Sequence, residues 1–150
     1  MRVFLAGATG VVGRFLVPQL VAEGHEVVGT TRSADKAARL RDGGAEGIVL
    51  DLLDRDAVRA AVTAAKPEAI INQATALSQL TAGSMRKFDK AFAVTNQLRT
   101  AGTDNLLAAA REAGATRFVA QSFAPLIYAR TGTSLKTEED ALDQHPAGNA

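Results

Sequence analysis

The sequence predicts an α/β protein built on one parallel, doubly wound β-sheet. Short apolar segments of strand length alternate with segments of helical period over residues 2–121, and glycines stand at every third position after the first strand. This alternation implies parallel strands joined by right-handed crossovers, with helices on both faces of the sheet. The expected strand order is 3-2-1-4-5, which is the Rossmann-type arrangement.

Strands and helices are expected in alternation along the chain. The strands are the apolar segments 2–6, 25–30, 47–50, 69–73 and 117–121, and the helices are the periodic segments 11–23, 34–42, 55–65 and 85–113. Residues after 121 are polar and lose this periodicity, which predicts a loop with no further strand.

Residues at the helix ends support these boundaries. Ser33 and Asp54 stand directly before two of the helices, where a short polar side chain can accept from a free backbone N–H group. Gly24, Gly43 and Gly114 follow helices, and each suits the left-handed residue beyond a helix end.

Composition limits the classes of function. Of the 150 residues, 47% are hydrophobic and 22% charged, and the formal net charge is +1, so no general attraction to nucleic acid or to an acidic membrane is expected. The chain has no cysteine, which excludes disulfides and thiolate chemistry and fits a reducing compartment. We expect a cytoplasmic protein with no nucleic-acid partner, no membrane partner and no metal site.

The turn "GATGVVG" at residues 7–13 predicts a dinucleotide-binding site. Gly7 can adopt the unusual dihedral angles of the turn, Gly10 lets phosphates approach the backbone, and Gly13 lets the helix pack closely on the first strand. A ligand-free glycine-rich turn is the alternative, but a strand before it and a helix after it favour the dinucleotide. Three further residues of the turn are expected to contact the cofactor: Thr9, Val11 and Val12.

Residues 1–33, from "MRVFLAGATG" to "TTRS", resemble the start of the short-chain dehydrogenase/reductase superfamily. The resemblance is to its extended or atypical branch of epimerase/dehydratase-like proteins, and it spans about residues 1–128. It implies that residues 1–150 are an NAD(P)-binding Rossmann domain, the N-terminal part of a longer chain.

The resemblance also implies further contacts with the cofactor. In "IVLDLLD", at residues 48–54, it places Asp51 near the adenine amino group and Leu52 on the adenine face. In "INQAT", at residues 71–75, it places Gln73, Ala74 and Thr75 along the cofactor, although Asn72 and Gln73 depart from the usual residues of the family. It places Asn96 near the active site, with a surface amide on a long helix as the alternative.

The residues after the second strand favour NADP(H) over NAD(H). NAD-binding relatives carry an acidic residue at the end of this strand, whereas this chain has Thr31 there with Arg32 beside it. Arg32 could hold a 2′-phosphate through paired charge-assisted hydrogen bonds, and Lys36 is the expected secondary contact. An arginine that only solvates a loop is the alternative.

The catalytic Tyr-x-x-x-Lys pair of the family is absent from these residues. The one tyrosine, Tyr128, is followed four positions later by Gly132, so the catalytic acid is expected beyond residue 150 or is missing. The family's catalytic Ser or Thr falls near Ser122, which could instead be a strand-end serine bonded to the backbone.

We therefore expect the NADP(H)-binding domain of a short-chain oxidoreductase that acts on a carbonyl or alcohol, with a sugar nucleotide as the substrate suggested by the resemblance. The alternative is an atypical member that binds the dinucleotide as a redox sensor or regulator. The helix at 85–113 carries Phe88, Phe92 and Leu98, which serve either a homodimer interface or packing on the sheet.

Overall fold

The computed structural model describes residues 1–77, 85–122, 128–129, 131–132 and 134–143, and of residues 85–91 only their place in a helix. The chain forms two compact units, Met1–Ala120 and Gln121–Ala150. All regular helices and strands described lie in the first unit.

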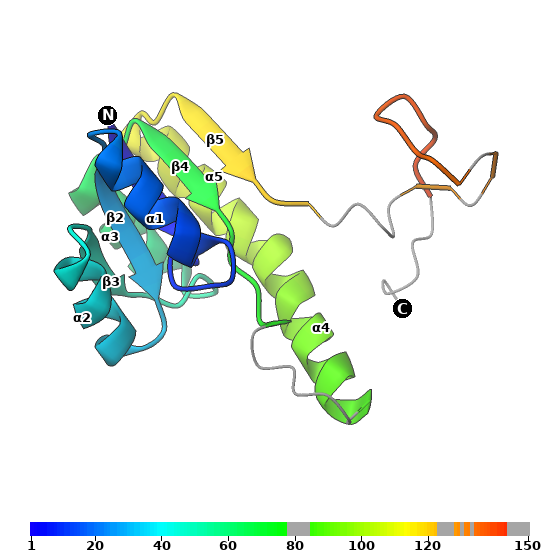
Figure 1. Cartoon of the computed structure of the whole chain (residues 1–150), viewed down its shortest axis with the longest axis horizontal. Helices are drawn as coiled ribbons and strands as arrows, with labels where there is room; N and C mark the ends of the chain where they lie inside the picture. Colours follow the sequence, from blue (N-terminus) through cyan, green and yellow to red (C-terminus); the bar gives the residue numbers. More distant parts are fainter. Residues whose placement is uncertain (78–84, 123–127, 130, 133, 144–150) are drawn as a thin grey trace. The chain divides into compact units, whose positions relative to one another are not determined.

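A five-stranded parallel sheet forms the centre of the first unit (Figure 1). Its strands are β1 (Arg2–Ala6), β2 (Glu26–Thr31), β3 (Glu46–Val49), β4 (Ala69–Asn72) and β5 (Arg117–Ala120). Their order is β3-β2-β1-β4-β5, which confirms the predicted topology. In the register of the central strands, Leu5 of β1 lies beside Gly29 of β2 and Ile71 of β4.

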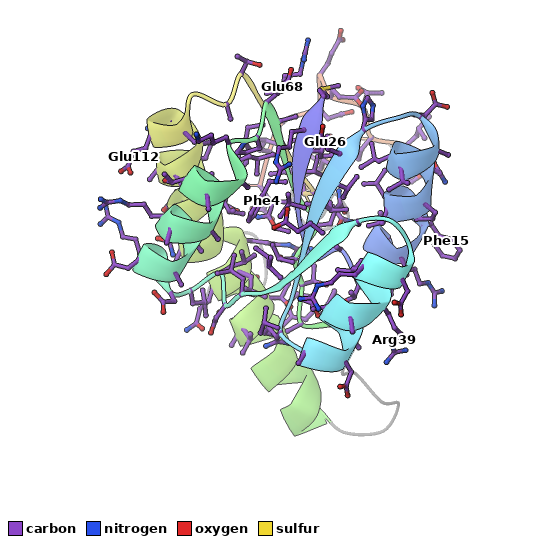
Figure 2. The ribbon with its side chains drawn as sticks, turned by 90° about the vertical axis from the view of Figure 1, so that its left-hand side faces the viewer. Phe4, Phe15, Glu26, Arg39, Glu68 and Glu112 are labelled. Carbon is purple, nitrogen blue, oxygen red and sulfur yellow. The ribbon has the colours of Figure 1, made fainter. Side chains whose placement is uncertain are left out.

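Two helical layers cover the sheet. The helices are α1 (Gly13–Ala22), α2 (Ala34–Asp42), α3 (Arg55–Ala65), α4 (Met85–Arg99) and α5 (Ala101–Ala113). Figure 2 shows the sheet nearly edge-on, with α1 and α2 on one side and α3 and α5 on the other. Successive residues of β1 supply both cores, because Phe4 packs in the cluster with α3 and α5 and Leu5 in the cluster with α1 and α2.

The predicted helix caps are largely confirmed. The Ser33 side chain accepts from Lys36 N and the Asp54 side chain accepts from Ala57 N, so each satisfies one free amide of its helix. Gly24 and Gly114 have φ of 77° and 73°.

The prediction for Gly43 was wrong. Its φ is −86°, and the left-handed residue is Gly44, with φ of 84°. Gly44 N donates to Arg41 O and Ala45 N donates to Leu40 O, so the closing turn of α2 ends one residue later than expected.

Two helix boundaries also differ from the predictions. The first helix begins at Gly13 rather than at residue 11, because the two valines before it still belong to the glycine turn. The expected helix at 85–113 is two helices, separated at Thr100, where φ is −93° and ψ is −88°. The Thr100 hydroxyl donates to Asn96 O at 2.8 Å, a local side-chain bond that competes with regular helix geometry.

In the second unit, Tyr128 and Leu142 form an isolated antiparallel bridge, and Ala129 N donates to Ala141 O at 2.8 Å. After Ala120, the described residues contain this isolated bridge but no strand and no helix. Nowhere in the described ranges does a helix have the length and apolar character needed to cross a membrane.

Candidate functional site

The predicted site residues of the first unit gather at the carboxyl edge of the sheet, because parallel strands all end on the same side. The glycine turn follows β1, Thr31 and Arg32 lie at the end of β2, Asp51 follows β3, and residues 72–75 lie at the end of β4. Ligands of open α/β sheets bind at this edge.

Two of the three turn glycines are required by the fold itself. Gly7 has φ of +80°, and a Cβ there would lie 2.8 Å from Ala74 N, so the turn packs directly on the chain leaving β4. A Cβ on Gly13 would lie 2.6 Å from the carbonyl oxygen of Ala8, so α1 packs directly on the turn. Any larger residue at either position would have to displace backbone.

Gly10 differs from these two glycines. A Cβ there would meet one atom within 4 Å, the carbonyl oxygen of Gly7 at 3.2 Å, and the backbone of Gly10 is not in the left-handed region. The fold therefore comes close to accepting a side chain at Gly10. Its lack of one leaves the backbone open to a ligand, which is the feature that a phosphate needs for close approach.

The start of α1 presents free backbone donors. Val12 is its N-cap and forms no side-chain cap, and the first turn has no acidic residue. In the part of the chain that the structure describes, the N–H groups of Val11, Val12 and Gly13 have no hydrogen-bond partner. Free N–H groups and the positive end of the helix dipole together favour an anion at this point.

Two threonines fasten the glycine turn to β2. Thr30 Oγ1 accepts from Gly7 N at 3.3 Å, and Thr31 Oγ1 accepts from Thr9 Oγ1 at 3.0 Å. Thr31 is 8% exposed and its hydroxyl oxygen also accepts from Ser33 N at 3.4 Å. Thr31 thus anchors the turn, while Arg32 beside it is exposed.

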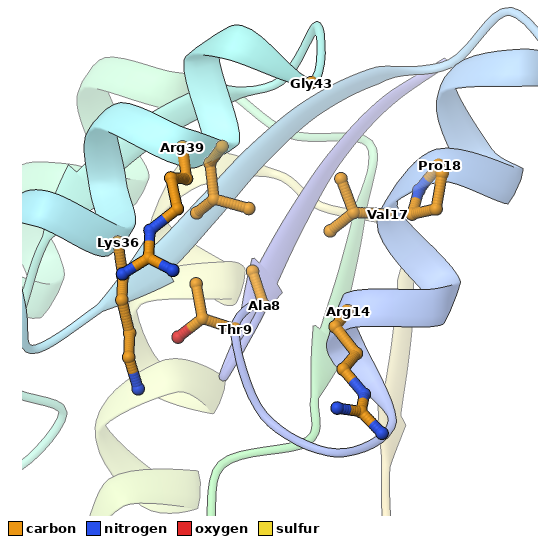
Figure 3. Close-up of a pocket in the computed structure, with 9 residues that line it drawn as sticks. Ala8, Thr9, Arg14, Val17, Pro18, Lys36, Arg39 and Gly43 are labelled. Carbon is orange, nitrogen blue, oxygen red and sulfur yellow. The ribbon is translucent and has the colours of Figure 1, made fainter.

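A groove of about 400 Å³ lies between α1 and α2 and opens at the glycine turn (Figure 3). In Figure 3, Lys36 and Arg39 extend from α2 toward Thr9, and Arg14 stands across from them on α1. Arg14 is not among the site residues predicted from the sequence. The sequence feature that could have identified Arg14 is its place in the first turn of a helix, because the helix dipole disfavours positive charge there.

The two residues that were predicted to contact adenine follow β3 and differ in their exposure. Asp51 is exposed, and its Oδ1 accepts from Leu53 N at 3.0 Å, which shapes the loop into α3. Leu52 is 4% exposed and belongs to the core. Its side chain offers little surface to a ligand, whereas that of Leu53 is 37% exposed.

Polar side chains shape the chain that leaves β4. Asn72 is buried, accepts from Ala74 N at 3.1 Å and donates to Thr103 Oγ1 at 3.0 Å. Gln73, Ala74 and Thr75 are half-buried, and the backbone of Gln73 and Ala74 lies against Gly7. The departure at Asn72 from the usual family residue therefore has a structural function, since this amide holds the site segment to α5.

Helix α4 is tied to the same segment through a threonine that no sequence pattern singles out. Thr95 is fully buried, and its Oγ1 accepts from Ala76 N at 3.1 Å. Asn96, one residue later, is half-buried. Leu98 is 5% exposed in the core, so it packs within the unit, and the Phe88 side chain lies outside the described residues.

The second unit contains Ser122 and Tyr128. Ser122 is exposed, and Tyr128 is half-buried at the antiparallel bridge.

Comparison with known proteins adds to this geometry. The sequence model of the NAD dependent epimerase/dehydratase family matches residues 3–149. A 3-diazoavenalumate denitrifying reductase from a Streptomyces species is 48% identical over 124 residues, which are 83% of this chain and 38% of the reductase.

Solved structures show the same architecture. A UDP-glucose 4-epimerase from Thermus thermophilus, crystallised in complex with NAD, is 26% identical, with a TM-score of 0.73 over 93% of this chain and 43% of the epimerase. A UDP-glucose-4-epimerase from Stenotrophomonas maltophila is 22% identical, with a TM-score of 0.74 over 99% of this chain and 44% of the epimerase. The chain thus spans less than half the length of each of these proteins.

Proposed function

We propose, because the chain belongs to the NAD dependent epimerase/dehydratase family, that residues 1–150 are the NADP(H)-binding part of an oxidoreductase. The observation that carries the proposal is the contrast within the glycine turn. Gly7 and Gly13 are required for packing, whereas Gly10 leaves open the backbone beside the free N–H groups of α1.

The residues of this chain would bind and orient the cofactor. The N–H groups at the start of α1 would receive the pyrophosphate, Asp51 would lie at the adenine, and Gln73, Ala74 and Thr75 would follow the cofactor along the end of β4. When bound, the nicotinamide supplies hydride transfer, and the protein supplies binding and orientation.

The preference for NADP(H) rests on charge at the end of β2. Thr31 provides no carboxylate that would repel a phosphate, and the exposed Arg32 and Lys36 provide cations. The Thermus thermophilus epimerase was crystallised with NAD, so the choice of cofactor is a property to be measured on this chain.

The substrate we propose for the whole protein is a small carbonyl or alcohol. The 48% identical relative is named a reductase, which supports hydride transfer. The epimerases act on UDP-glucose by their names, which supports a sugar nucleotide as the second substrate class. The alternative function is a dinucleotide-binding sensor, which would bind the cofactor in the same way but would not catalyse turnover.

Substitution of Gly10 tests cofactor binding. Gly10→Ala should weaken NADP⁺ binding by at least about tenfold, because its methyl group occupies the approach of the pyrophosphate, while the fold is retained. The matched control is Gly102→Ala, where a Cβ makes ordinary contact at 3.5 Å. Titration calorimetry and circular dichroism measure the two effects. Unchanged affinity with a native spectrum would mean that the turn is structural only.

Substitution of Arg32 tests the choice of cofactor. Arg32→Ala should weaken NADP⁺ binding about tenfold to a hundredfold, the contribution of a charge-assisted hydrogen bond, and leave NAD⁺ nearly unchanged. Thr31→Asp should reverse the preference through repulsion of the phosphate. Equal losses for both dinucleotides, or a wild type that prefers NAD⁺, would contradict the assignment.

A further inference from the structure

The groove between α1 and α2 combines an apolar floor with a cationic mouth. Its nine lining residues include three cations and no carboxylate (Figure 3). They are Ala8, Thr9, Arg14, Val17, Pro18, Lys36, Arg39, Leu40 and Gly43. Ala8, Val17 and Leu40 are at most 8% exposed and form the floor. Cations beside an apolar floor attract an anion more strongly than the same cations in open water.

None of the three cations forms a close ion pair in the described part of the protein. The ion pairs there involve other residues, and none includes Arg14, Lys36 or Arg39. Arg14 has its guanidinium carbon 4.7 Å from the centre of the Phe15 ring, and that ring is 59% exposed. These side chains therefore form no ion pair within the described residues that an entering anion would have to break.

The position of Arg14 adds a second reason to expect an anion. It stands in the first turn of α1, whose N-terminus already presents free N–H groups and has neither a side-chain cap nor an acidic residue. A cation there is unfavourable for the helix, since it adds to the positive end of the dipole. An anion bound at this point would be stabilised by the side chain and by the dipole together.

We propose that the mouth of this groove receives the phosphate group that distinguishes NADP from NAD, and that Arg14 and Arg39 are specificity-determining residues in addition to Arg32 and Lys36. The proposal rests on the function proposed above. Thr9 of the glycine turn lines the groove, and so does Lys36, which follows β2. Three cations that line one groove suit a phosphate monoester of nearly two negative charges better than a single carboxylate, and planar guanidinium groups match its oxygens.

The test compares ligands that differ only by this phosphate. Calorimetry is done with 2′,5′-ADP and 5′-AMP, and with NADP⁺ and NAD⁺, on the wild type, Arg14→Gln, Arg39→Gln and the double variant. Each single substitution should weaken 2′,5′-ADP and NADP⁺ about tenfold to a hundredfold and leave 5′-AMP and NAD⁺ unchanged. In the double variant the losses should be non-additive, because both side chains contact one phosphate.

Controls separate binding from folding. Arg111→Gln removes an exposed cation from α5, on the opposite face of the sheet, and should change neither ligand. Arg14→Gln should leave the melting temperature equal or slightly higher, since it removes a cation from the start of a helix. Arg14→Lys should retain part of the preference, because the charge remains while the planar donor pair is lost.

The outcomes distinguish this inference from the function on which it rests. If the wild type prefers NADP⁺ but keeps that preference in Arg14→Gln and Arg39→Gln, these two residues do not select the phosphate, this inference is wrong and the proposed function stands. If the wild type binds neither dinucleotide, or binds both equally, the proposed function is wrong and this inference fails with it.

Discussion

The two helical layers of the sheet pack in different ways. Helices α3 and α5 pack directly on each other, whereas α1 and α2 each contact β2 but hardly contact one another. The α3–α5 layer interlocks through fully buried Val58, Val62 and Leu106 against small residues such as Ala109. Between α1 and α2, by contrast, the facing residues include three cations and Pro18, and a groove remains between the two helices. One layer therefore provides stability and the other provides room for a ligand.

The largest expected effect is in the close-packed layer. Leu106→Ala should lower the free energy of unfolding by about 2 to 5 kcal/mol, because it removes a fully buried side chain and leaves a cavity. Leu142→Ala is the matched control, since Leu142 is 63% exposed and its truncation should change stability by less than about 0.5 kcal/mol. Denaturant titration measures both. Equal effects would mean that the α3–α5 layer is not a rigid core.

A gain in stability is expected in the open layer. Pro18 lies inside α1, where it cannot donate to the carbonyl of Arg14. Pro18→Ala should raise the free energy of unfolding by about 1 to 3 kcal/mol, and Pro18→Gly by about 1 kcal/mol less, because glycine is the weaker helix former. Urea denaturation of the three proteins compares them. A loss of stability in Pro18→Ala would show that the proline is required for packing.

The smallest effect is expected at the surface of the close-packed layer. Arg59 of α3 and Glu112 of α5 form an ion pair at 3.1 Å, with side chains that are 64% and 51% exposed. Solvent screens such pairs, so Arg59→Ala should change the free energy of unfolding by no more than about 1 kcal/mol. Thermal melting at low and high salt checks this. A loss comparable to that of Leu106→Ala would mean that charge, rather than apolar packing, joins these helices.

Local signals in the amino-acid sequence determine much of the architecture by themselves. The alternation of apolar segments predicts the strands and the sheet order, which follow from backbone chirality and connection length. Ser33 and Asp54 predict two helix starts, because an N-cap depends only on residues three positions apart. Whether the turn, Arg32 and residues 73–75 contact a dinucleotide stays a prediction.

Only the tertiary structure decided the contacts between segments that lie far apart in the chain. Leu52 entered the core because α5 covers it, with Asn105 Nδ2 donating to Leu52 O at 2.9 Å. The hydrogen bond from Asn72 to Thr103 likewise joins the end of β4 to α5. The groove that joins Arg14 to Lys36 and Arg39 depends on how far α1 stands from α2. Periodicity reports which face of an element is buried, whereas the distance between two elements is set by the volumes and charges of the side chains that meet there.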